Sequence, residues 1–247
     1  MTGGLDSNAM LEFCTTHDIR LIIDAAHPFA SLLHSTVGAV SEQLDIPVIR
    51  LERRYPPRDE SLVWCDSFDD AIDYLESHEI NHLLALSGVQ TIGKLRRYWE
   101  KHACHFRVLD REDSRTLAKQ TGFPEKNLLF WHEGQDELVL FRQLHPGAIL
   151  TKESGESGYY EEKVTAARQL GIPVIVIRRP PLPDSFYTVN GEHGLRYRVE
   201  RLLPGFYPLR SGFTTGSCAT AATRAALLGL LTQEIQNSAT IALPDGE

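Results

Sequence analysis

Short runs of β-branched and aliphatic residues alternate with longer amphipathic stretches through most of the chain. Apolar runs of about four to eight residues are typical of buried strands, and the stretches between them have the length and period of helices. Parallel strands need crossover connections, usually helices, so this order favours βαβ units and a mainly parallel sheet. The expected fold class is therefore α/β.

The hydrophobic pattern predicts where the strands and helices lie, and it divides the chain into four parts. Strands are expected at residues 20–24, 47–51, 62–64, 82–86, 104–109, 128–130, 148–151 and 173–177, and helices at 8–17, 28–44, 68–77, 90–102, 136–144 and 160–170. A polar, proline-bearing stretch at 53–60 reads as a linker, so two Rossmann-like domains are expected, at residues 1–58 and 59–183. Residues 184–209 have no clear helical period and are expected to be a linker. A new pattern starts at 210–247, with an alanine-rich helix from Ala219 to about Leu231.

A weak internal repeat relates the two predicted domains. Residues 43–54 match residues 169–179, and each copy follows a predicted helix. The loops that open those helices, at 27–28 and 153–155, should then occupy equivalent places. In parallel sheets such loops lie at the carboxyl edge of the strands, where ligands bind.

Charge and composition exclude several classes of protein. The formal net charge of -8 gives no long-range field that would attract nucleic acid. The chain has no run of about 18 apolar residues and no signal-peptide pattern, so a cytoplasmic location without membrane contact is expected. Its four cysteines lack any Cys-x-x-Cys spacing, and its histidines lack a spacing that demands a metal, so no metal site is expected.

The strongest local signal is Asp-Ala-Ala-His-Pro-Phe at residues 24–29, directly after a predicted strand. Pro28 suits the first turn of a helix, and the free amides of a helix start can hold an anion. His27 would feel the positive end of the helix dipole, which favours the neutral imidazole. Two interpretations stay open: Asp24 and His27 only cap the turn, or they serve hydrogen bonding or proton donation.

Further candidates follow other strands. Residues 151–158 form a glycine- and hydroxyl-rich loop whose amides, Lys152 and Ser154 could bind a carboxylate or phosphate, although many connections of this kind bind nothing. Ser87 and Gly88 either approach a ligand closely or form a tight turn. Arginines follow both repeated strands and could bind a polycarboxylate, or be solvated charges paired with nearby acids; they are Arg50, Arg53, Arg54, Arg178 and Arg179.

Together, the segments at residues 23–30, 47–53, 151–155 and 172–180 resemble the precorrin-6A reductase family, in the same order over about residues 3–183. The resemblance implies two Rossmann-like domains and a reaction of cobalamin biosynthesis, in which NADPH or NADH reduces a ring double bond of precorrin-6A or cobalt-precorrin-6A. Carried over to this sequence, His27 is the catalytic residue and candidate proton donor, with Tyr159 second. The residues implied to bind substrate are Asp24, Arg53, Thr151, Lys152, Ser154, Gly155 and Arg178, and those implied to bind the cofactor are Ser87 and Gly88.

Two departures from that family shape the functional expectation. Its members begin with a strand, a Gly-Gly-Thr loop and a helix that hold the nucleotide phosphates, and this chain starts after that point, so the first domain is expected to be incomplete. Residues 210–231 resemble the opening of the cobalt-precorrin-5B C-1 methyltransferase family, which implies part of a reductase-methyltransferase fusion and association with other cobalamin-pathway enzymes. The alternative is a non-catalytic fragment that binds a tetrapyrrole or a partner and lacks the cofactor cradle.

Overall fold

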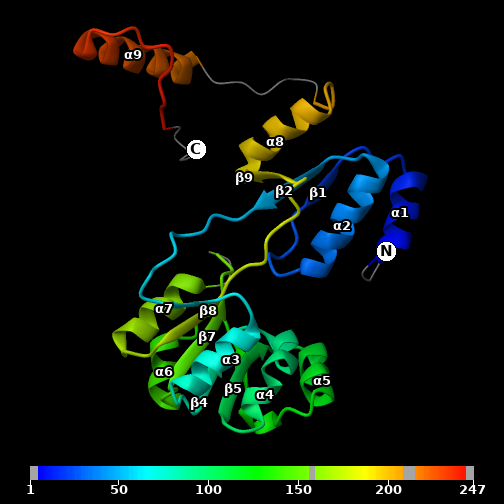
Figure 1. Ribbon diagram of the computed structural model, residues 1–247, viewed down its shortest axis with the longest axis vertical. Coiled ribbons are helices and arrows are strands. Elements are labelled where there is room, and N and C mark those ends of the chain that lie inside the picture. The colour runs from blue at the N-terminus through cyan, green and yellow to red at the C-terminus, as the bar shows by residue number, and fades with distance from the viewer. Residues whose placement is uncertain (1–4, 156–158, 208–214, 243–247) are drawn as a thin grey trace. The chain divides into compact units, whose positions relative to one another are not determined.

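A computed structural model describes residues 5–155, 159–207 and 215–242. The chain divides into two compact units, and the first ends at Gly191. Within that first unit, two sheets of parallel strands are each covered by helices (Figure 1). The structure therefore confirms the predicted α/β class with mainly parallel sheets. Among the described residues, no helix is both long and apolar enough to cross a lipid bilayer.

The smaller sheet has the strand order β1-β2-β9, all parallel. Its strands are β1 (Ile22–Asp24), β2 (Val48–Glu52) and β9 (Tyr187–Asn190), and its helices are α1 (Ser7–Thr16) and α2 (Ser31–Leu44). The Asp6 carboxylate accepts a hydrogen bond from the Ala9 amide and so caps the start of α1. Apolar residues of both helices and of β1 and β2 form two small buried clusters, around Val40 and Val48.

The larger sheet has the strand order β3-β8-β7-β4-β5-β6, again all parallel. Its strands are β3 (Val63–Cys65), β4 (His82–Ala85), β5 (Ala103–Leu109), β6 (Leu128–Trp131), β7 (Ala148–Lys152) and β8 (Val174–Ile177). Its α-helices are α3 (Phe68–Ser77), α4 (Arg96–Trp99), α5 (Glu112–Gln120), α6 (Glu137–Leu144) and α7 (Tyr160–Gln169), and its 3-10 helices are η1 (Val89–Thr91), η2 (Gly93–Leu95) and η3 (Glu125–Asn127).

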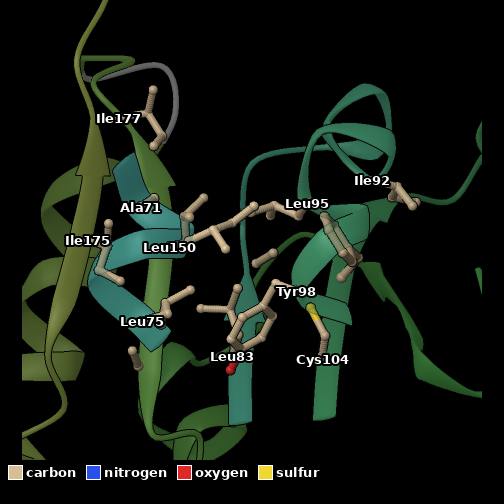
Figure 2. Close-up of a cluster of buried hydrophobic side chains, with 14 of the residues drawn as sticks. Ala71, Leu75, Leu83, Ile92, Leu95, Tyr98, Cys104, Leu150, Ile175 and Ile177 are labelled. Carbon is tan, nitrogen blue, oxygen red and sulfur yellow. The ribbon is translucent and has the colours of Figure 1, made fainter. Parts of the chain in front are cut away.

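Helices cover both faces of this larger sheet, which explains why its strands read as unbroken apolar runs. Neighbouring residues of one strand fall into different cores: Leu150 packs with α3 and α4, whereas Ile149 packs with α6 and α7. Figure 2 shows the first of these cores, where Ala71 and Leu75 of α3 face the sheet beside Leu83 and Leu150. Burying one such leucine stabilises the fold by about 1.5–3 kcal/mol. The sheet is therefore a rigid support for the loops at its carboxyl edge.

The internal repeat corresponds to two βαβ units. β1-α2-β2 and β7-α7-β8 each consist of a strand, a helix and a parallel neighbouring strand. The loops after β1 and β7 therefore lie at carboxyl ends of parallel strands, as the repeat predicts.

The expected linker at residues 184–209 differs from the structure, which places β9 and α8 (Gly191–Leu202) there. Most of β9 is exposed, so it carries no hydrophobic run that the sequence could reveal. Its extended form comes instead from pairing with β2, where Asn190 also donates a side-chain hydrogen bond to the Glu52 carbonyl. The chain thus returns to the smaller sheet after completing the larger one. The second unit contains α9 (Thr215–Thr232), in agreement with the expected alanine-rich helix.

The structure differs from the expected helices at two more places. The helix expected at 90–102 is broken into η1, η2 and α4. Gly93 lowers the helix propensity there, and the Trp99 indole donates to the Ile92 carbonyl, which competes with regular helical bonding. Helix α5 was not expected, because it buries only Ser114 and Ala118 and so shows little apolar period.

Candidate functional site

A cavity of about 750 Å³ lies at the carboxyl ends of five parallel strands, β1, β3, β4, β7 and β8. This is the place where ligands bind in open α/β sheets. The residues that line it come from the loops after these strands: His27, Phe29, Ala30, Ser31, Asp66, Ser67, Phe68, Asp69, Gln90, Thr91, Lys94, Lys152, Ile177, Arg178 and Pro180. Of the residues predicted from sequence, the cavity thus brings together His27, Lys152 and Arg178.

The loop between β1 and α2 is held by the Asp24 carboxylate. Asp24 accepts hydrogen bonds from the Ala26 amide at 2.9 Å and from Arg50 at 3.1 Å, and it contacts His34 Nδ1 at 2.6 Å. The Arg50 side chain is 0% exposed, so this ion pair is removed from solvent. Both oxygens of the Asp24 carboxylate therefore have partners within the protein. Its expected contact with substrate stays a prediction, and the geometry favours a positioning role.

His34 links this buried ion pair to the backbone of the loop. Its Nε2 lies 3.1 Å from the His27 carbonyl oxygen. A carbonyl oxygen only accepts, so Nε2 carries a hydrogen and donates it. The sequence reasoning missed His34, although it lies one helical turn into α2 on the side that faces Asp24. Asp24 and His34 together fix where His27 stands.

The His27 ring is held as one neutral tautomer. The Phe29 amide donates to Nδ1 at 3.2 Å, so the ring hydrogen is on Nε2. Burial, followed by the positive charges of Lys152 and Arg53, lowers the pKa of His27 to about 4. At pH 7 only about one ring in a thousand is then protonated. His27 in this neutral form is a hydrogen-bond donor through Nε2. Its expected role as proton donor stays a prediction.

Lys152 ends β7 and is partly buried at the cavity wall. Its ammonium lies 5.2 Å from the centre of the Phe29 ring, a cation-π contact. Within the described part of the chain, no carboxylate forms an ion pair with it. Burial and the charge of Lys94 lower the pKa of Lys152 to about 8.

The rest of the predicted loop turns away from the cavity. Thr151 is buried, and because side chains alternate along a strand, it points to the face opposite to that of Lys152. The Ser154 carbonyl accepts a hydrogen bond from Arg53 at 2.9 Å. Gly155 has a φ of +70°, and a Cβ there would lie 3.0 Å from the Arg54 carbonyl oxygen. Ser154 and Gly155 therefore attach this loop to the chain segment after β2.

Two other predicted residues follow β4. The Ser87 hydroxyl is buried and lies 2.6 Å from the Thr91 hydroxyl. Gly88 has a φ of +88° and a ψ of 162°, a conformation that glycine adopts readily and other residues rarely. A Cβ at Gly88 would meet no atom within 4 Å. The backbone at Gly88 is thus open to a ligand, whereas the Ser87 hydroxyl is hydrogen-bonded to Thr91.

Glu153 is an important residue that the sequence reasoning left without a role. Its buried carboxylate accepts two hydrogen bonds from Arg58 at 3.0 Å and one from the Arg179 amide, also at 3.0 Å. It thereby joins the end of β7 to both segments that connect the two sheets. The sequence analysis named Arg179 of this network, but nothing local in the sequence marks Arg58 or Glu153 as part of it.

Comparison with known proteins places the chain in a family. The family model described as precorrin-6x reductase CbiJ/CobK matches residues 1–194. The chain belongs to this family. A second family model, CbiD, matches residues 205–247.

Relatives of this reductase family agree with the assignment. The cobalt-precorrin-6A reductase of Methanothermobacter thermautotrophicus is 33% identical over 185 residues, which are 73% of this chain and 61% of that protein. The match therefore spans less than two thirds of that relative. The precorrin-6A reductase of Rhodococcus erythropolis is 31% identical over 78% of this chain and 75% of its own length. A solved CobK precorrin-6A reductase superposes with a TM-score of 0.68 at 20% identity, covering 84% of this chain and 82% of its own, which shows the same fold.

Proposed function

We propose that this chain carries out the reductase step of cobalamin biosynthesis, in which NADPH or NADH reduces one ring double bond of precorrin-6A or cobalt-precorrin-6A. The observation that supports this most is the large cavity with basic side chains at the carboxyl edge of the strands, in a chain of the precorrin-6x reductase family. The acetate and propionate groups of such a tetrapyrrole need cationic partners. The CbiD match further supports a reductase-methyltransferase fusion.

Arg178 and Lys152 suit the binding of substrate carboxylates. Arg178 pairs with Asp66 at 2.7 Å, but the Asp66 side chain is 75% exposed. Exposed ion pairs contribute only about 0–1 kcal/mol, so a substrate carboxylate can replace Asp66 at little cost. Lys152 has no competing carboxylate among the described residues. His27 offers its Nε2 hydrogen to the same cavity, and Asp24 and His34 hold it in place.

The segment after β4 fits a nicotinamide nucleotide. The open backbone at Gly88 lets a ligand approach without a side chain in the way. Ser87 would support this turn through its bond to Thr91, which also donates to the Gly88 carbonyl at 2.7 Å. When bound there, a reduced nicotinamide supplies a hydride.

An assay of tetrapyrrole reduction tests the proposed function. Purified chain is mixed with NADPH or NADH and with precorrin-6A or cobalt-precorrin-6A, and loss of the reduced-nicotinamide absorbance is followed. Tetrapyrrole-dependent oxidation supports the proposal. Spectral changes of the tetrapyrrole that saturate, without any change in nicotinamide absorbance or fluorescence, would favour the non-catalytic binding fragment instead.

A further inference from the structure

Lys152 is a partly buried ammonium group whose charge is balanced by no neighbour that the structure describes. Its ammonium makes a cation-π contact with the ring of Phe29. A buried cation normally has an ionic or hydrogen-bonding partner. Lys152 lies at the cavity wall and ends β7, where Glu153 anchors the loop 153–155. This arrangement presents a proton-bearing nitrogen to whatever fills the cavity.

The other groups at the cavity are poorer sources of a proton. His27 is held neutral by burial, by the surrounding positive charge and by the Phe29 amide, which donates to Nδ1. Arg178 has a guanidinium that does not release a proton under ordinary conditions. Asp66 is ion-paired to Arg178 and is largely exposed. Lys94 also lines the cavity, and its ammonium contacts the Phe68 ring, 5.2 Å from the ring centre.

We propose that Lys152 is the general acid of the reduction, a role that rests on the function proposed above. The proton passes from its ammonium group to one carbon of the reduced ring double bond, while the adjacent carbon receives the hydride from the reduced nicotinamide. The π bond breaks, two C–H bonds form, the nicotinamide is oxidised, and Lys152 is left as a neutral amine. Solvent returns the proton to Lys152 after product leaves.

The charges around Lys152 favour this release. Burial and the positive charge of Lys94, which lines the same cavity, make the ammonium form less favourable. The charged and titratable groups that line the cavity with it are His27, Asp66, Asp69, Lys94 and Arg178, and Lys163 of α7 lies close enough to interact with it. The pKa of Lys152, about 8, suits a general acid that works near neutral pH.

Lys152→Arg and Lys152→Met separate this role from carboxylate binding. Arginine keeps the positive charge but cannot release its proton. A purely binding role predicts that Lys152→Arg restores KM and kcat. The general-acid role predicts that KM recovers only in Lys152→Arg, whereas kcat falls about 100-fold or more in both variants. The alkaline fall of kcat near pH 8 should also disappear in both. Lys119→Met, an exposed change on α5, should leave kcat and KM unchanged and serves as the control.

A second measurement needs no substrate or cofactor. Lysine labelled with ¹³C at Cε gives an NMR titration, and one signal should move near pH 8 and be missing in Lys152→Met. The His27 signals should titrate at higher pH in Lys152→Met, because one of the charges that lowers its pKa is gone.

The outcomes are distinguishable. If the wild-type chain oxidises nicotinamide with the tetrapyrrole and Lys152→Arg does so at a similar kcat with the same alkaline fall, only the role of Lys152 is refuted. If the wild-type chain shows no such oxidation, the proposed function fails, and the role of Lys152 fails with it. A Lys152 signal that titrates only near the ordinary lysine pKa contradicts the proposal without any activity measurement.

Discussion

The Asp24→Asn variant should lose about 3 kcal/mol of stability. Asparagine keeps the size of the side chain but removes the negative charge that faces Arg50, a side chain without solvent contact. It also removes the carboxylate oxygen that lies 2.6 Å from His34 Nδ1. Removing one partner of a buried ion pair costs about 3–5 kcal/mol. Arg50 keeps Glu52 at 3.4 Å, so the loss should fall at the lower end of that range.

Urea denaturation followed by circular dichroism measures this loss, and hydrogen exchange locates it. The three tryptophans, Trp64, Trp99 and Trp131, belong to elements of the larger sheet, so their fluorescence does not report on β1 and β2. Amide exchange in β1 and β2 should therefore accelerate more than exchange in β4 and β7. Asp110→Asn is the matched control, because Asp110 and Arg115 are each 44% exposed and their ion pair should contribute about 0–1 kcal/mol. Equal losses in the two variants would refute the reasoning.

Three further variants test the site. Lys152 has a pKa of about 8 in the folded chain against an ordinary 10.5, so between these pH values the unfolded chain binds more protons and stability rises with pH. Lys152→Met should therefore be about 3 kcal/mol more stable than wild type at pH 7, and this difference in stability should be smaller at pH 10. A difference in urea denaturation that does not depend on pH would contradict this. Gly155→Ala should lose about 1–3 kcal/mol by the same assay, because it combines a positive φ with a 3.0 Å contact to the Arg54 carbonyl. Gly171→Ala, with a φ of +65° and open space, should lose less, and an equal loss would argue against the contact. His27→Ala should lower turnover more than folding stability, and unchanged kcat in a folded variant would remove His27 from the site.

Several features of the site could be predicted from sequence because they depend on local order along the chain. The repeat at residues 43–54 and 169–179 predicted that the loops after two strands are equivalent, and parallel βαβ geometry puts both at carboxyl strand ends. That reasoning placed His27 and Lys152 each at the carboxyl edge of its own sheet. It did not reveal that Ser154 and Gly155 contact the segment after β2, since nothing local in either segment refers to the other.

The arginines also show that local sequence does not reveal contacts between distant segments. Arg50, Arg53 and Arg178 read alike in the sequence, as charges that follow strands. In the structure, Arg50 is buried against Asp24, Arg53 donates to the Ser154 carbonyl, and Arg178 lines the cavity. Which of the three can meet a ligand depends on residues that lie up to 112 positions away in the chain, such as Asp66 for Arg178.

By itself, the sequence determined the α/β class, the parallel strands and the loops at their carboxyl edge, because hydrophobic period and strand-helix order are local properties of the chain. The tertiary structure alone decided the return of β9 to the smaller sheet, the burial of Asp24 with Arg50, and the position of Lys152 without a carboxylate partner among the described residues. The physical reason is that strand pairing, burial and the electrostatic surroundings of a charge are set by groups distant in sequence. These distant groups therefore decide whether a residue can bind a ligand or instead holds the loop that binds it.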